Sequence, residues 1–177
     1  MSEDPAGWDA MWAGPPQPEP RALILTPMPL AAPAAALCAI AHVAGVAVPS
    51  PVGAVLVLDD AEEQSAHDAG RTLSTAMVGA AVVLLRRGPS EDPAAADVQV
   101  YHYQRGMRTP ASAPGLVLAN LPVEVEDLLL AGLDARDVTG AVDATALSEE
   151  AAARILDVAA SAAPGMPHGE YHGGDDT

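Results

Sequence analysis

The residues best suited to chemistry follow the ends of apolar runs that predict strands. Thr26, Asp59, the neighbours Arg86 and Arg87, and Asn120 all occupy such positions. Carboxylate, guanidinium and amide groups held together could bind a metal ion and an anionic group. If the strands are parallel, these side chains meet at the carboxyl edge of the sheet, where open α/β sheets bind ligands. An ion pair of Asp59 and a helix cap by Asn120 explain the same residues without a ligand.

A second candidate site lies on one face of a predicted helix. Asp60, Glu63 and His67 are separated by three and four residues, so a helix would place them on one side. With Asp59 just before them, Asp59, Glu63 and His67 are candidate metal ligands. The same acids also fit a solvated helix surface, and Asp60 with Glu63 fits a helix N-cap with its reciprocal carboxylate.

Several common catalytic motifs are absent from the sequence. The 8 basic residues are all arginine, so no lysine can serve a phosphate-binding loop or form a Schiff base. The sequence has neither a Gly-x-Gly-x-x-Gly turn nor a Gly-x-Ser-x-Gly nucleophile elbow. The one cysteine, Cys38, allows no disulfide within the chain and no cysteine-based metal site. No cofactor follows from these residues.

The charge of the chain is strongly negative. Its 177 residues include 24 acidic side chains, and the formal net charge is -16. This charge repels phosphate backbones and anionic lipids, so neither nucleic acid nor a membrane is an expected partner. A solvated surface and a face for a basic protein partner both explain it. The N-terminus lacks the pattern of a secretory signal, so we expect a soluble cytoplasmic protein.

The two ends of the chain differ in composition from its middle. Residues 1–20 are rich in proline and acids, and residues 164–177 are again polar, so we predict flexible tails around a single domain over residues 21–163. Trp8 and Trp12 stand four residues apart in the first tail and would share one face of a helix. They are candidate partner-binding residues, with docking onto the domain itself as the alternative.

The pattern of apolar segments predicts an α/β fold, or α+β. Three buried strands alternate with two helices, at residues 22–26, 34–44, 53–59, 60–78 and 80–85. Such alternation predicts a parallel βαβαβ core with right-handed crossovers. Two hairpin strands and then two helices are expected after the core, at residues 97–103, 116–119, 122–131 and 148–163.

Two functions are compatible with these features. The missing motifs, the acidic charge and the tryptophans favour a non-catalytic accessory or interaction module. The alternative is a small metal-assisted hydrolase or transferase that acts on an anionic metabolite at the strand edge. An enzyme requires Asp59 and an arginine to converge in a cleft, whereas a module requires an exposed apolar patch. The alternating strand between Val98 and Tyr103 could also support an oligomer through a sheet edge.

Overall fold

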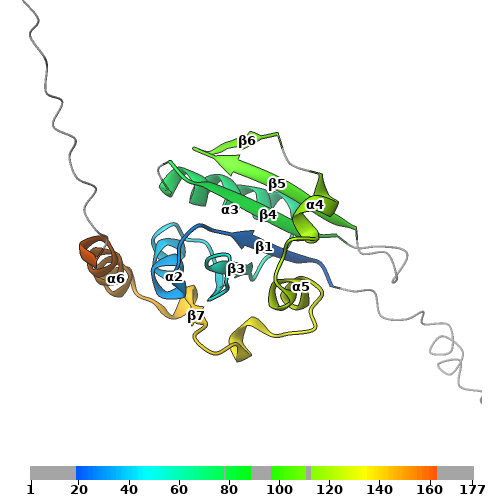
Figure 1. Cartoon of the computed structure of the whole chain (residues 1–177). Helices are drawn as coiled ribbons and strands as arrows, with labels where there is room; N and C mark the ends of the chain where they lie inside the picture. Colours follow the sequence, from blue (N-terminus) through cyan, green and yellow to red (C-terminus); the bar gives the residue numbers. More distant parts are fainter. Residues whose placement is uncertain (1–18, 78, 89–96, 111–112, 163–177) are drawn as a thin grey trace, which may run out of the picture.

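The computed structural model describes residues 19–77, 79–88, 97–110 and 113–162 (Figure 1). Within these residues the chain forms a seven-stranded sheet with the order β6-β5-β4-β1-β3-β2-β7. Every strand runs antiparallel to its neighbours. Trp8, Trp12 and nearly all of the two predicted tails lie outside the described residues, so those interpretations stay predictions.

The strands of the sheet are short, and the central ones are buried on both faces. They are β1 (Arg21–Leu25), β2 (Gly45–Val48), β3 (Val55–Leu58), β4 (Ala81–Arg87), β5 (Val98–Gln104), β6 (Met107–Thr109) and β7 (Val142–Asp143). Successive side chains point to opposite faces. Ile24 and Leu56 therefore belong to one hydrophobic cluster, and Leu23 and Val57 belong to the other.

Helices cover both faces of the sheet. The described residues form α2 (Ala31–Ile40), α3 (Glu63–Ala76), α4 (Pro114–Leu118), α5 (Val123–Leu129) and α6 (Glu149–Ala162), with 3-10 turns η1 (Ala135–Asp137) and η2 (Ala144–Ala146). Side chains of α2 and α3 complete the first cluster, whereas side chains of α4, α5 and η1 complete the second. Figure 1 shows α3 behind β4 and β5, with α4 and α5 in front of the sheet.

The predicted parallel βαβαβ core is wrong. Gly45–Val48 forms β2, a strand that the sequence analysis did not predict, and β2 pairs with β3 as an antiparallel hairpin. β3 therefore enters the sheet beside β1 in the opposite direction. α3 then carries the chain across β1 to β4, which is also antiparallel to β1. The order β4-β1-β3-β2 is the βαββαβ arrangement of ferredoxin-like domains.

The second predicted hairpin strand, at residues 116–119, is also wrong. These residues lie in and just after α4, which has Pro114 at its start, where the missing N–H of proline costs no helical hydrogen bond. The strand that follows β5 is instead β6. The first hairpin prediction is confirmed, because β5 pairs antiparallel with β4 along its whole length.

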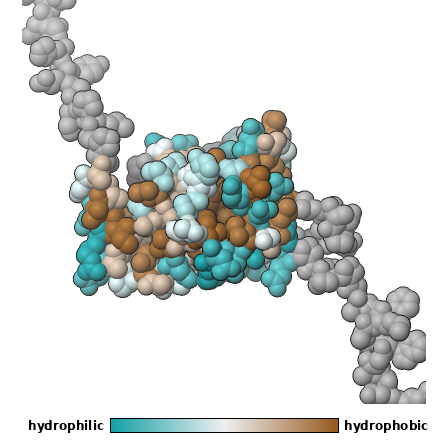
Figure 2. Space-filling model, turned by 60° about the horizontal axis from the view of Figure 1, so that its bottom comes forward, coloured by the Kyte–Doolittle hydropathy of each residue, from teal (hydrophilic) through white to brown (hydrophobic). Residues whose placement is uncertain are grey.

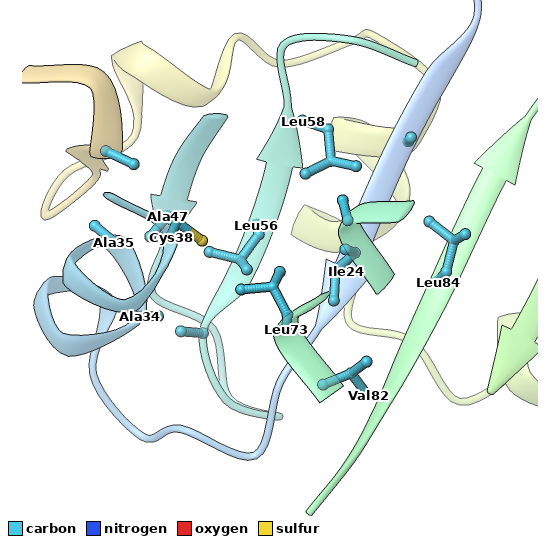
Figure 3. Packing of buried hydrophobic residues seen from close by; sticks show 14 of the residues in the cluster. Ile24, Ala34, Ala35, Cys38, Ala47, Leu56, Leu58, Leu73, Val82 and Leu84 are labelled. Carbon is cyan, nitrogen blue, oxygen red and sulfur yellow. The ribbon is translucent and has the colours of Figure 1, made fainter. Parts of the chain in front are cut away.

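α2 is apolar on all sides because it lies between the sheet and α6. Its side chains Ala34 and Cys38 pack with Ala47 and Leu56 of the sheet (Figure 3). The opposite side of α2 contacts α6. The predicted burial is confirmed for most of this helix, but α2 spans Ala31–Ile40 rather than residues 34–44, and Ile40 is exposed. No helix in the described part of the chain is both long and apolar enough to cross a membrane.

Candidate functional site

The predicted ligand residues are divided between the two ends of the sheet. β3 and β4 are both antiparallel to β1 and so parallel to each other. Asp59, Arg86 and Arg87, which lie at the C-terminal ends of β3 and β4, therefore lie at the same end of the sheet. Thr26 follows β1, which runs the other way, and so lies at the opposite end of the strands. Its buried hydroxyl donates a hydrogen bond to the carbonyl of Ala54 at 2.8 Å. Thr26 therefore joins two chain segments far from Asp59.

Contrary to the prediction, Asn120 does not follow a strand, because the residues before it form α4. Its Nδ2 donates to the carbonyl oxygen of Leu116 at 2.7 Å. This bond satisfies a carbonyl in the last turn of α4, so Asn120 closes the preceding helix.

Arg86 and Arg87 are 7% and 5% exposed, and both bind backbone carbonyls. Nε of Arg86 donates to the carbonyl of Ala61 at 3.1 Å, and its Nη1 lies 3.9 Å from Oε2 of Glu63. Nη2 of Arg87 donates to the carbonyl of Glu19 at 3.1 Å. The two guanidinium groups thus tie the end of β4 to the segments that precede α3 and β1.

Asp59 lies in a small polar cleft at the same edge. Nη2 of Arg136 donates to Oδ1 of Asp59 at 3.2 Å and to Oδ2 of Asp143 at 3.3 Å. The cleft has a volume of about 180 Å³, and its charged lining residues are Glu19, Arg21, Asp59, Asp134 and Arg136. A carboxylate and an arginine therefore do converge, although the arginine comes from η1 rather than from β4.

The charged side chains in this cleft stabilise one another's ionised forms. The hydrogen bond to Asp59 and the charges of Asp59 and Asp143 raise the pKa of Arg136. Hydrogen bonds from Thr145, together with Arg136, lower the pKa of Asp143. Arg136 thus clamps the end of β3 to β7.

His67, a candidate metal ligand, packs inward against β5. Its Nδ1 is hydrogen-bonded to the hydroxyl of Tyr103, and its ring lies edge-on to Tyr101 at a centroid distance of 4.5 Å. Its Nε2 lies 3.9 Å from Oε1 of Glu63. Burial, and next the charge of Arg108, lower the pKa of His67. The neutral tautomer that carries its proton on Nε2, toward Glu63, lets Nδ1 accept a hydrogen bond from the Tyr103 hydroxyl.

The predicted metal site does not assemble. Asp59 is paired with Arg136, whereas Glu63 and His67 lie beside each other next to Arg86. Over the described ranges, no three His, Cys, Asp or Glu side chains are grouped so as to hold a metal ion.

Asp60 forms a turn before α3 rather than its N-cap. Its Oδ1 accepts a hydrogen bond from the backbone N–H of Glu62 at 2.9 Å. The N-cap position is Glu62, which makes no side-chain capping bond. The predicted capping pair is therefore wrong, because the helix begins later than the spacing of Asp60 and Glu63 requires.

A larger groove, which the sequence analysis missed, lies between α3 and the loop that follows α2. Its volume is about 320 Å³. One wall is a stripe of α3 at a spacing of three and four residues, and the other is the loop of residues 41–44. We call it the His42 groove; its lining residues are Ala41, His42, Val43, Ala44, Leu58, Asp60, Ser65, Asp68, Ala69 and Thr72.

α5 presents an apolar and acidic surface on its outer side. Its inner side chains are buried in the second cluster, whereas Val123 is 68% and Leu130 43% exposed. Positions three and four residues apart share a helix face, so Glu126 and Asp127 lie between these two apolar residues. We call Val123, Glu126, Asp127 and Leu130 the α5 stripe.

α6 has an exposed apolar residue of its own. Val158 is 70% exposed. Figure 2 shows hydrophobic side chains at the surface beside the end of this helix. Val158 thus offers a matched position on a different helix against which the α5 stripe can be tested.

Comparisons with protein-family models, with curated proteins and with solved structures found no match to this chain. The class of the fold therefore rests on the strand order alone, and a ferredoxin-like arrangement is shared by proteins of many functions. The function has to be argued from the surfaces and clefts of this chain.

Proposed function

We propose that the protein is a non-catalytic interaction module that binds a basic protein partner through the α5 stripe. The observation that carries the proposal is the exposure of Val123, at the start of α5, and of Leu130, its C-cap residue, beside two carboxylates of the same short helix. Exposed aliphatic side chains favour burial in an interface, and the flanking acids favour a partner with basic side chains. The net charge of -16 would attract such a partner over longer distances.

The state of the strand-edge residues also supports a module. Nε of Arg86 and Nη2 of Arg87 each donate to a backbone carbonyl, although Nε of Arg87 is buried without a hydrogen-bond partner among the described residues. The charge of Asp59 is balanced by Arg136. These contacts stabilise the junctions between segments, which accounts for the residues without a substrate.

The test is capture of a partner by the full chain. The wild type, the double variant Val123→Ser with Leu130→Ser, and the control Val158→Ser are immobilised and exposed to a soluble extract of the source organism. We expect one protein to be retained by the wild type and the control, and retained about tenfold less by the double variant. Its retention should also weaken as salt rises, because exposed charges are screened.

The proposal fails if the three chains retain the same proteins equally, or if none of them retains any protein. Circular dichroism of each variant excludes loss of folding, which we do not expect because all three side chains lie at the surface.

The cleft at Asp59 favours a second candidate, a metal-assisted hydrolase or transferase acting on an anionic metabolite. Arg21 and Arg136 would hold the anion, and Asp59, once released from Arg136, would provide a single protein ligand to a metal ion bound together with that anion. Thermal unfolding with divalent metals, phosphate esters and carboxylates tests this candidate. A rise in melting temperature that disappears in Asp59→Asn would support it, and no rise with any ligand would remove it.

Location and assembly belong to the same proposal. A single free thiol, Cys38, suits the reducing cytoplasm. β6 pairs with only the last three residues of β5, so an oligomer could form along residues 98–101, whose outer side pairs with no strand in the part of the chain that the structure describes. Sedimentation at several concentrations tests this, since a monomer throughout would contradict it.

A further inference from the structure

The His42 groove combines an aliphatic floor with an acidic rim. Val43, Leu58 and Ala69 supply apolar surface, and the rim carries the carboxylates of Asp60 and Asp68. The hydroxyl residues Ser65 and Thr72 and the imidazole of His42 are the other polar groups of the groove. The lining residues include no arginine, and the chain has no lysine.

Both carboxylates already accept hydrogen bonds within the protein. Hydrogen bonds from Ser65 and from the N–H of Glu62 lower the pKa of Asp60. Asp68 accepts hydrogen bonds from Gln64 and, at 2.8 Å, from Nη1 of Arg71. Its side chain is still 54% exposed, so it can accept another donor.

The size and shape of the groove suit a slender ligand. A volume of about 320 Å³ is at the lower end of the range for small-molecule sites. An anion would meet two carboxylates and no cation among the lining residues, although Asp68 is paired with Arg71 beside the groove. An ammonium group would find carboxylate oxygens as acceptors. Methylene groups attached to that ammonium would cover the apolar floor.

We propose that the His42 groove binds an alkylammonium group, with its methylene chain on Val43, Leu58 and Ala69 and its ammonium at the rim formed by Asp60 and Asp68. A lysine side chain of a partner protein and a free aliphatic amine carry the same chemistry. The groove lies on the α3 side of the sheet, and the α5 stripe lies on the other side, so the two proposals stand or fall separately.

The experiment is a titration of the full chain followed by amide NMR shifts. Butylamine represents the free amine, Nα-acetyl-lysine methylamide represents a protein side chain, and butanol is the uncharged control. We expect saturable shifts at residues 41–44 and 65–72 with at least one of the two cations and none with butanol. Saturation by the lysine derivative alone assigns the groove to a protein partner, and saturation by butylamine alone assigns it to a small amine.

Two variants and a control locate the binding. Asp60→Asn with Asp68→Asn should weaken binding about tenfold or more, because each loses a charge-assisted hydrogen bond. Ala44→Leu, which fills the groove without changing charge, should also abolish the shifts. Glu149→Gln with Asp157→Asn removes two acids from α6 and should leave binding unchanged. Equal weakening in that control, equal shifts with butanol, or no saturation by either cation would overturn the proposal.

Discussion

Gly70 of α3 lies directly against the ring of Tyr103 on β5. A Cβ atom at Gly70 would be 2.9 Å from both Cδ2 and Cε2 of that ring. Glycine inside a helix costs about 1 kcal/mol relative to alanine, so the residue looks like a weakness in the sequence. The close approach explains it, because it lets the tyrosine pass under α3 and reach His67 one turn earlier.

Gly70→Ala should therefore destabilise the protein, although alanine is the better helix former. We expect a loss of about 1–3 kcal/mol in the free energy of unfolding, because the added methyl overpacks the contact with Tyr103. Urea denaturation measures it. Gly115→Ala is the matched control, since no atom lies within 4 Å of the added Cβ in α4. A neutral or stabilising Gly70→Ala would show that the ring moves aside without cost.

His67 should make the protein less stable as the pH falls. Its pKa is lowered in the folded state, so the folded chain binds fewer protons than the unfolded chain below about pH 6.5. The free energy of unfolding must then decrease on acidification from that pH. Melting temperatures at pH 7.5 and 5.5 should differ less in His67→Gln than in the wild type. An unchanged difference would contradict the prediction.

The pH dependence due to His67 can be separated from that of the other titrating groups. Asp60 and Asp143 also have lowered pKa values, but aspartate loses its stabilising charge only near pH 4 and below. His42→Gln at an exposed position provides the control for a general loss of imidazole.

Removal of Arg136 should change stability less than removal of Arg86. Both side chains contact acids, but Arg136 is 55% exposed, and exposed ion pairs contribute about 0–1 kcal/mol. Arg86→Ala removes a buried guanidinium and leaves the partly buried carbonyl of Ala61 without its donor, for which we expect a loss of about 1–3 kcal/mol in the free energy of unfolding. Denaturation curves of the two variants decide this. An equal or larger effect of Arg136→Ala would mean that the ion pairs of Arg136 with Asp59 and Asp143 contribute more to stability than their exposure indicates.

Cys38 should not react with thiol reagents in the folded protein. Its side chain packs against the sheet, and burial raises its pKa to about 12, so the reactive thiolate is scarce at pH 8. Modification by a disulfide reagent should be slow in buffer and complete at once in denaturant. Fast labelling of the folded chain would show that α2 opens readily.

Much of the local structure could be predicted from periodicity. The apolar runs at β1, β3 and β4 and the amphipathic pattern of α3 are visible without coordinates. The strand directions are not, because a buried strand of four or five apolar residues reads the same in a parallel and an antiparallel sheet. β2 has only four residues, and missing it reversed the expected direction of β3 relative to β1.

The candidate site shows the same limit. Asp59 and the two arginines of β4 share an edge because β3 and β4 are parallel to each other, although β1 lies between them. The partner of Asp59 is Arg136, which is far away in the sequence and lies on a 3-10 turn. No local pattern marks such a pairing. The His42 groove was not predicted, because residues 41–44, which form one of its walls, were assigned to the end of a helix that in the structure stops at Ile40.

The central place of β1 also has a consequence for synthesis of the chain. β1 is made first, pairs with β3 on one side, and completes its other side only when β4 has been made. At about 5–20 residues per second, this takes on the order of seconds after β1 is finished. A nascent chain released before Arg87 would leave an apolar strand edge open to other chains. During synthesis, the central part of the sheet is thus expected to form only after β4 has left the ribosome.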